Sequence, residues 1–129
     1  MSYFDNLTFN LTAARLRIDN SPHCSNIETR LDSLIDNLIY PFSLSYAKPF
    51  LIVNGYVSPK LQPVVRMPRS SQHLKGYACD ISAGTKFENQ IIFEILSKMD
   101  YDILAIVGDY KQIHVSYRQG NNRNKIIRL

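Results

Sequence analysis

Residues 71–81 read SQHLKGYACDI and carry most of what this sequence says about its fold. Residues 77–82 predict a β-strand, on which Asp80 points to the opposite face from its two neighbours. The small residue Gly76 lets the preceding loop turn back, so we expect His73 to face Asp80. One short segment therefore places an imidazole beside a carboxylate.

A second imidazole, that of His114, opens a predicted strand over residues 113–117. Two imidazoles and one carboxylate suit Zn²⁺, whose fourth position is left to water in catalytic sites. The spacing is not that of the helical H-E-x-x-H motif, in which two ligands lie one turn apart. From spacing alone an alternative stays open, in which His73, Asp80 and His114 are unrelated polar residues.

Two amphipathic helices are predicted, one before and one after this segment. The first is expected to begin with a capping box at Ser25 and Glu28 and to end at Pro41, because proline disfavours helix at and before its own position. The second is expected over residues 86–99. Each has one apolar stripe, namely Ile27, Leu31, Leu34, Ile35 and Leu38 in the first and Phe87, Ile91, Ile95 and Leu96 in the second.

The remaining predicted elements are short. They are strands over residues 50–53, 103–107 and 113–117, a short helix over 12–16 and a long loop over 56–72. The last two strands are expected to form a hairpin. Together these elements predict an α+β fold, an antiparallel sheet with helices packed on one side. No repeat or linker divides the sequence, so residues 1–129 are expected to form a single domain.

Composition excludes several classes of protein. Of the 129 residues, 45% are hydrophobic and 20% are charged, which is typical of a globular domain. The longest apolar run, residues 103–107, is far shorter than the roughly 20 residues of a membrane helix, so we expect no membrane insertion. The first residues do not form a secretory signal. Cys24 and Cys79 form no CxxC pattern, and we expect them to be reduced thiols.

The charge balance is moderately basic, with 15 Lys and Arg against 11 Asp and Glu and a net charge of +4. The excess lies mostly near the C-terminus, in Arg118, Arg123, Lys125 and Arg128. Such a surface can attract an anionic polymer, for example a cell-wall polymer or a nucleic acid. The sequence has no arginine-rich run and no basic helix with interleaved aromatic residues, so we expect no specific nucleic-acid site.

The spacing of Ser71, His73, Gly76, Ala78 and Asp80 resembles the S-x-H-x-x-G-x-A-x-D signature of the zinc D-alanyl-D-alanine carboxypeptidases. That superfamily also includes D-Ala-D-Ala dipeptidases, phage L-alanyl-D-glutamate endolysins and the hedgehog signalling domain. A later segment, IHVSY at the predicted last strand, is similar to its second metal motif, W-x-H-x-S. The likeness runs over almost the whole chain and looks most like the small phage-type branch.

This resemblance implies a hedgehog/D-Ala-D-Ala peptidase-like fold in which Zn²⁺ is held by His73, Asp80 and His114. It also implies that Ser71 holds the substrate, a peptidoglycan stem peptide. A phage protein of this kind is expected to be made in the host cytoplasm without a signal peptide. It would then act at the cell wall or in the virion.

Two groups that the family uses for catalysis are replaced in this sequence. Zinc-assisted amide hydrolysis needs a general base, and it needs a cation or donor that stabilises the oxyanion. Val57 stands where the family has an arginine, and Val107 and Lys111 stand where its glutamate base is found. Asp109 is the one carboxylate near this strand and could replace the base. Its alternative role is that of a turn-forming residue beside Gly108.

These departures leave three hypotheses. The favoured one is a zinc-binding, peptidase-like domain of phage origin with weakened or lost catalysis, serving as a structural or binding component of a virion. The second is an active peptidoglycan D,D-carboxypeptidase or endopeptidase, in which Arg66 or Arg69 supplies the missing cation. The third is a globular adaptor that binds no metal. The partners expected for the first two are peptidoglycan stem peptides or virion proteins.

Overall fold

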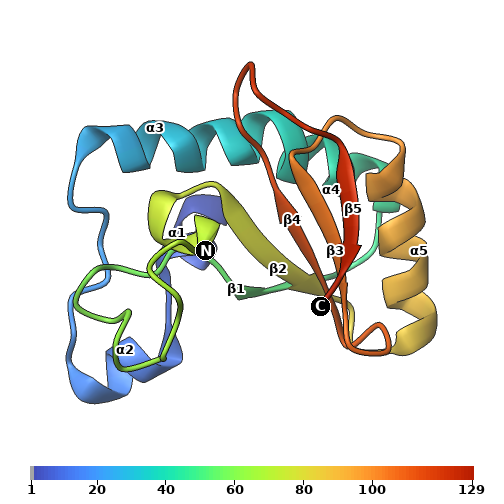
Figure 1. The fold of residues 1–129 in the computed structure, drawn as a ribbon. Helices are drawn as coiled ribbons and strands as arrows, with labels where there is room; N and C mark the ends of the chain where they lie inside the picture. Colours follow the sequence, from blue (N-terminus) through green and yellow to red (C-terminus); the bar gives the residue numbers. More distant parts are fainter. Residues whose placement is uncertain (1) are drawn as a thin grey trace.

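The computed structural model describes residues 2–129 and shows a five-stranded sheet with helices around it (Figure 1). The α+β class expected from the sequence is confirmed. The helices are α1 (Tyr3–Thr8), α2 (Leu11–Leu16), α3 (Ser25–Leu34), the π-helical turn η1 (Ile35–Ile39), α4 (Tyr40–Tyr46), the 3₁₀ turn η2 (Gln72–Lys75) and α5 (Lys86–Ser97). The strands are β1 (Leu51–Asn54), β2 (Ala78–Ser82), β3 (Ile103–Val107), β4 (Gln112–Ser116) and β5 (Lys125–Arg128). No helix within residues 2–129 has the length and apolar character needed to cross a membrane.

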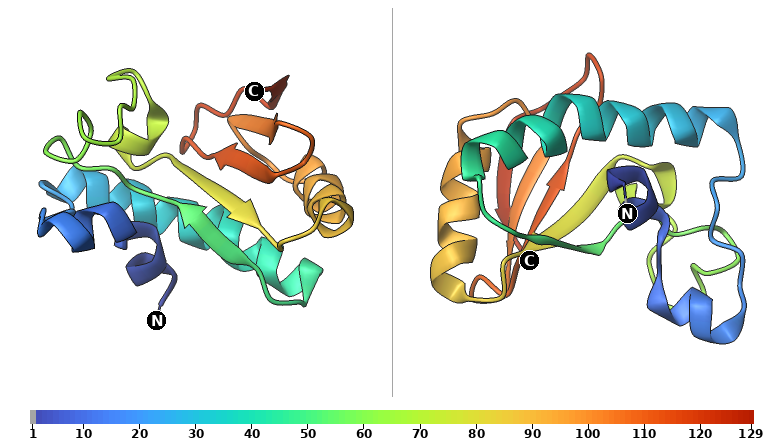
Figure 2. Two further views of the ribbon diagram at one scale, coloured as in Figure 1. Left: turned by 90° about the horizontal axis from the view of Figure 1, so that it is seen from below. Right: turned by 180° about the vertical axis from the view of Figure 1, so that it is seen from behind.

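The sheet is mixed, with the strand order β1-β2-β4-β3-β5. The first three pairings are antiparallel, and β3 and β4 form the predicted hairpin. The last pairing, of β5 with β3, is parallel, so the expectation of a purely antiparallel sheet is wrong at this edge. After β4 the chain loops back and runs beside β3 in the same direction (Figure 2). The sequence does not predict β5, because three of its four residues are exposed and it has no alternating pattern.

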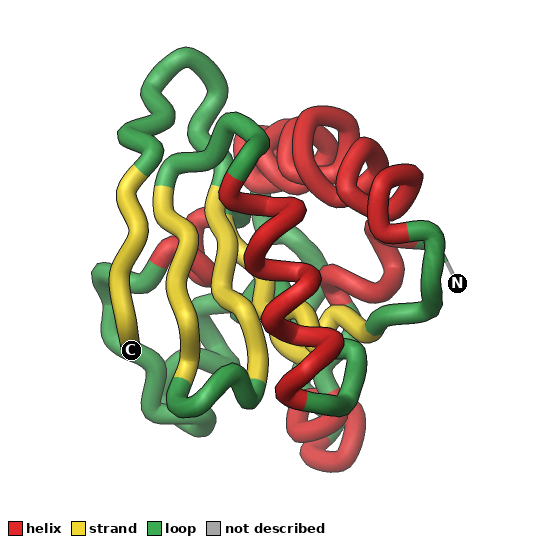
Figure 3. The backbone as a smooth tube through the Cα atoms, turned by 90° about the vertical axis from the view of Figure 1, so that its right-hand side faces the viewer, coloured by secondary structure: helices red, strands yellow, loops and turns green. Residues whose placement is uncertain are grey.

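One face of the sheet is apolar and packs against helices. Cys79, Ile81 and Val115 are fully buried on this face, together with Leu104 of β3. The long helices α3, α4 and α5 gather on one side of the strands (Figure 3). Successive side chains alternate between faces, so Asp80 and its cross-strand neighbour point to the other side. The sheet therefore separates the apolar core from its polar residues.

The helix that begins at Ser25 continues through Pro41, so the expected end at this proline is wrong. Just before the proline the hydrogen bonding widens, and the N–H of Tyr40 donates to the carbonyl oxygen of Ile35 five residues back. A wide turn of this kind accommodates a residue that lacks an N–H. The buried side chains of Leu34 before the turn, Leu38 within it and Phe42 after it hold the helical run against the core.

The other helix ends also depend on context. Cys24 is the N-cap of α3 and makes no side-chain capping bond, so the capping box expected at Ser25 and Glu28 is not formed. A capping box occurs instead at α1, between Ser2 and Asp5. The predicted helix over residues 12–16 is confirmed as α2.

The loop over residues 56–72 is fastened to the N-terminal segment. Asn20 donates from Nδ2 to the Tyr56 carbonyl oxygen at 2.9 Å, and its Oδ1 accepts from the Ser58 N–H at 2.7 Å. A second, smaller apolar cluster joins α2 to the loop through the buried side chains of Ala13, Val57 and Leu61. These contacts give the loop a defined path to η2.

Candidate metal centre

Three side chains that are far apart in the sequence meet on the polar face of the sheet. Asp80 of β2 lies directly opposite His114 of β4 in the strand register. His73 reaches them from η2, and one ligand atom of each residue lies within 4.8 Å of the other two. The structure thus brings together the three residues proposed from the sequence, and the alternative of unrelated positions does not hold.

The contacts within the cluster centre on the carboxylate. Oδ1 of Asp80 lies 2.9 Å from Nδ1 of His114, and Oδ2 lies 3.5 Å from Nε2 of His73. The two imidazole rings meet nearly edge to face, with centroids 5.2 Å apart. The side chains of His73 and Asp80 are buried, with exposures of 7% and 9%, and that of His114 is partly buried, with an exposure of 13%. The cluster is therefore largely shielded from bulk water and is most accessible to solvent at His114.

Outer partners orient the cluster. Nδ1 of His73 lies 2.8 Å from the Gly55 carbonyl oxygen, which can only accept a hydrogen bond. The proton of a neutral His73 ring therefore sits on Nδ1, and Nε2 offers its lone pair toward Asp80. Asn54 donates from Nδ2 to Oδ2 of Asp80 at 2.9 Å. Such partners fix the tautomer and direction of metal ligands.

Gly55 can hold this place because it has no side chain. A Cβ at Gly55 would overlap the carbonyl oxygen of Leu7. Any larger residue would push the strand end away from α1, and the carbonyl that holds His73 would move with it. Nothing in the local sequence pattern links Asn54 or Gly55 to the ligands, because both lie far from them along the chain.

The loop before β2 presents His73 through its own short-range contacts. Oγ of Ser71 accepts the N–H of His73 at 3.2 Å and so caps η2. Gly76 ends this turn with a φ of 78°, a left-handed conformation that favours glycine. Nε2 of Gln72 donates to Oδ2 of Asp102 at 2.8 Å, which ties η2 to the start of β3. Ser71 therefore positions His73, whether or not it also contacts a substrate.

The electrostatics of the cluster follow from these contacts. Burial by itself would raise the pKa of Asp80, but the hydrogen bonds from His114 and His73 outweigh it and lower that pKa far below its usual range. Burial by itself would lower the pKa of His73, but the Asp80 carboxylate outweighs it and raises that pKa. The ion-free cluster therefore favours the ionised form of the Asp80 carboxylate. A bound cation would compete with protons for the imidazole nitrogens that face it.

The donor set fits a divalent metal ion. In a tetrahedral zinc site with ligand bonds of about 2.0–2.1 Å, two ligand atoms lie about 3.3 Å apart. The separation of 3.5 Å between Nε2 of His73 and Oδ2 of Asp80 is close to that value. Two imidazoles and one carboxylate also suit other first-row metals, such as ferrous iron. The cluster can therefore hold a divalent first-row metal ion, and its ligand types suit both zinc and ferrous iron.

Asp109, the sequence candidate for a general base, lies outside the cluster. It stands in the hairpin turn between β3 and β4, with 74% of its side chain exposed, and pairs with Lys86 at 2.9 Å. This placement agrees with the turn-forming alternative, and Asp109 is not one of the residues whose ligand atoms meet in the cluster. Its role as a base stays a prediction that this placement does not support.

The candidate replacements for the missing arginine are also elsewhere. Val57 is buried with 3% exposure in the small apolar cluster with Leu61, so this position has an apolar role. Its backbone N–H donates to the carbonyl oxygen of His73 at 3.2 Å. Arg66 and Arg69 are exposed, and neither takes part in an ion pair with the cluster among residues 2–129.

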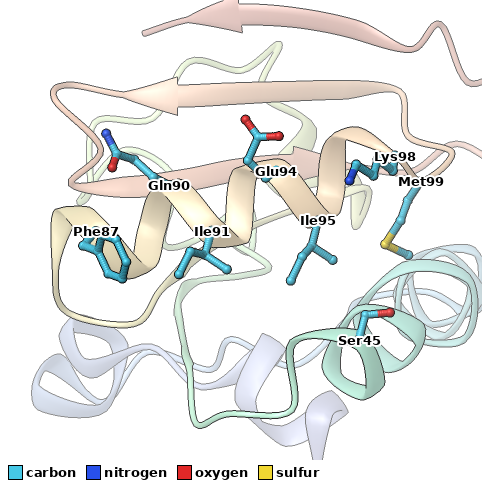
Figure 4. A pocket seen from close by; sticks show the side chains of 8 residues that line it. All are labelled: Ser45, Phe87, Gln90, Ile91, Glu94, Ile95, Lys98 and Met99. Carbon is cyan, nitrogen blue, oxygen red and sulfur yellow. The ribbon is translucent and has the colours of Figure 1, made fainter.

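A prominent surface hollow lies away from the cluster. It has a volume of about 520 Å³ and lies between α4 and α5 (Figure 4). Phe87, Ile91 and Ile95 of α5 point into it, and Ser45 faces them from α4. No cluster residue lines this hollow.

A scan against protein-family models and a search of curated proteins found no match for the chain. The candidate metal centre is therefore defined by its geometry alone.

Proposed function

We propose that this protein is a zinc-binding domain of the peptidoglycan-peptidase type, with a hedgehog/D-Ala-D-Ala peptidase-like fold and weakened or lost catalysis. We further propose that it serves as a structural or binding component of a phage virion. The observation that carries the proposal is the convergence of His73, Asp80 and His114 on one buried point. These are the residues that the sequence resemblance names as zinc ligands.

The chain supplies both the ligands and their supports. Nε2 of His73, the carboxylate of Asp80 and the imidazole of His114 would hold the ion, while the Gly55 carbonyl and Asn54 keep the first two in place. Zinc bound there would supply Lewis acidity toward a carbonyl group and a water molecule. The same binding would stabilise the folded chain, because an ion that binds only the folded state shifts the folding equilibrium.

Weakened catalysis follows from what surrounds the ligands. Asp109 is held in an exposed ion pair, and Val57 is buried in an apolar cluster. A peptidase that lacks one oxyanion-stabilising donor commonly loses a factor of about 10²–10³ in rate. Loss of the base costs a further factor of about 10²–10⁴. A chain without either group would keep the metal and the fold while hydrolysing peptides poorly.

The role in a virion rests on the phage-type resemblance and on this loss of catalytic groups. A domain that keeps its metal ligands while its catalytic positions become apolar retains a structural use for the ion. The net charge of +4 suits contact with an anionic surface. Within this proposal the partners are other virion proteins or peptidoglycan.

Metal analysis tests the zinc part directly. We expect about one zinc ion per chain, and we expect a chelator to remove it and lower the melting temperature. The variant His73→Ala should lose both the zinc and the effect of the chelator. His23→Ala is the matched control, because His23 is an exposed histidine outside the cluster. If His73→Ala binds zinc as the parent chain does, the proposed site is wrong.

The alternative is an active zinc-dependent peptidase that cuts D-Ala-D-Ala or L-alanyl-D-glutamate bonds in stem peptides. The intact ligand set favours it, with Ser71 in the loop beside His73 available to contact the peptide. Digestion of purified peptidoglycan decides between the two. Release of D-alanine or of new L-alanyl ends, lost with a chelator and with His73→Ala, would show activity and contradict the loss of catalysis. The zinc site itself would then stand.

A further inference from the structure

A pocket lined mostly by polar residues lies on the α3 side of the sheet, on the opposite face from the metal cluster. It has a volume of about 440 Å³ and lies between α3 and the segment that follows β4. Figure 1 shows this segment rising beside α3. Tyr77 and Tyr117 form its floor at the ends of β2 and β4, where the Tyr117 N–H donates to the Tyr77 carbonyl oxygen at 2.9 Å. Nothing in the proposed zinc function uses this pocket.

Two guanidinium groups lie against a single aromatic ring in this pocket. The Cζ atom of Arg30, from α3, is 4.7 Å from the centroid of the Tyr77 ring. The Cζ atom of Arg118, from the segment after β4, is 5.4 Å from the same centroid. The ring attracts both cations through its quadrupole. Both arginines also line the pocket, so an anion bound in it would be attracted to both guanidinium groups.

Neither arginine has a carboxylate partner in the part of the chain that the structure describes. None of the ion pairs found among residues 2–129 includes Arg30 or Arg118. Arg30 donates from Nη1 to the Lys75 carbonyl oxygen at 3.2 Å, which fixes its position without neutralising its charge. Nε of Arg118 is buried without any hydrogen-bond partner and is the one such side-chain atom within residues 2–129. A buried donor without an acceptor is a rare and costly feature.

The rest of the lining is polar and ordered. Oγ of Ser33 donates to Oε1 of Gln119 at 3.1 Å, which links α3 to the segment after β4 across the pocket. Nδ2 of Asn37 donates to the Ser33 carbonyl oxygen at 2.9 Å. The Ser33–Gln119 hydrogen bond joins the two sides of the pocket, so the pocket is already formed without a ligand.

We propose that this pocket binds a small ligand through an oxyanion group, a phosphate or a carboxylate, that the guanidinium groups of Arg30 and Arg118 recognise. Guanidinium groups present several donors in a planar fork that matches both kinds of anion. A bound oxyanion would give the two guanidinium groups the anionic partner that they lack among residues 2–129. The volume exceeds that of a bare ion and falls in the range of small-molecule sites. The pocket therefore has room for more than the anionic group.

Titration of metal-free protein with inorganic phosphate and, separately, with acetate tests this proposal. Removal of metal ensures that neither anion reports on the metal cluster. Chloride keeps the ionic strength constant, and backbone amide NMR shifts of Tyr77 and Arg118 report binding. We expect saturable shifts around the pocket. Tighter binding of phosphate would assign a phosphate ligand, and tighter binding of acetate would assign a carboxylate ligand.

Variants of the two arginines give the decisive comparison. Arg118→Gln and Arg30→Gln should each weaken anion binding about tenfold or more, since each loses charge-assisted hydrogen bonds. Arg69→Gln is the matched control, because Arg69 is exposed and does not line the pocket. Arg30 lies on α3 and is only partly buried. If Arg118→Gln does not fold, the anion affinity of Arg30→Gln therefore tests the proposal. The proposal is overturned if neither anion shifts the pocket amides, or if Arg30→Gln binds as the parent chain does.

Discussion

Two buried aspartates, Asp80 in β2 and Asp102 just before β3, meet very different partners. Both contact the η2 turn, Asp80 through His73 and Asp102 through Gln72. Asp102 accepts from Nε and Nη2 of Arg123 at 2.9 Å each, and from the backbone N–H of the same residue at 3.1 Å. Asp80 lies between two imidazoles, those of His73 and His114, and accepts a hydrogen bond from the side-chain amide of Asn54.

The difference shows how partners decide the role of a buried carboxylate. The guanidinium group of Arg123 stays protonated and can only donate, so the Asp102 network is complete in itself. The imidazoles around Asp80 can give up a proton and become lone-pair ligands. Asp102 therefore completes a structural hydrogen-bond network, whereas Asp80 belongs to a site that can bind a cation.

The largest contrast is expected in the response to zinc. Zinc at about 1,000 times its dissociation constant should raise the unfolding free energy by about 4 kcal/mol in the parent chain. Asp80→Asn should abolish this increase, because a neutral amide replaces the anionic ligand. Asp102→Asn should keep it. Urea denaturation with and without zinc measures both, and a normal zinc response in Asp80→Asn would remove the distinction between the two aspartates.

The second contrast concerns the metal-free protein. Asp102→Asn should lower its unfolding free energy by about 2–3 kcal/mol, because the buried network loses its charge and leaves donors unsatisfied. This loss of unfolding free energy is modest for a buried carboxylate, because the side chain of Arg123 is 52% exposed and solvent screens its ion pair with Asp102. Asp36→Asn, at an exposed position, is the control and should change stability by less than about 0.5 kcal/mol. Equal stabilities of the two variants would show that the network contributes little.

Acid should weaken the Asp102 network in a defined window. The hydrogen bond from Arg123 lowers the pKa of Asp102 to about 2, against burial, which would raise it. A folded-state pKa below the ordinary value means that the stabilisation is present above about pH 4 and is lost as the pH falls toward 2. The loss should be no more than about 2 kcal/mol. Metal-free Asp102→Asn should show a shallower stability decline over this window, and parallel pH profiles would contradict the account.

The smallest effect is expected at an outer partner of the metal cluster. Asn54→Ala removes the amide that donates to Asp80 and should weaken zinc binding about tenfold, with little change in the metal-free stability. Competition with a chelating dye measures the dissociation constant. Asn121→Ala, at an exposed position away from the cluster, should bind zinc as the parent chain does. Equal affinities would mean that the strands alone orient Asp80.

Local patterns predicted most of the elements but not the edge of the sheet. The amphipathic stripe at Ile27 and Leu31 and the β3–β4 hairpin follow from side-chain periodicity, and the structure confirms both. The end expected at Pro41 is wrong because burial of neighbouring apolar residues outweighs the proline penalty. The strand β5 and its parallel pairing depend on β3, some twenty residues earlier, so no local pattern reports them.

The amino-acid sequence fixes which chemical groups are available. The residue types and the family resemblance indicated His73, Asp80 and His114 as metal ligands, although their spacing alone left this open. How these groups are used depends on the folded chain. Pairing of β2 with β4 placed Asp80 opposite His114, and the hairpin turn removed Asp109 from the site. Hydrogen bonds and Coulomb forces act over a few ångströms of space, whereas the residues that make them here are tens of positions apart along the chain. A carboxylate's partners, and hence its charge state and role, therefore follow from the fold.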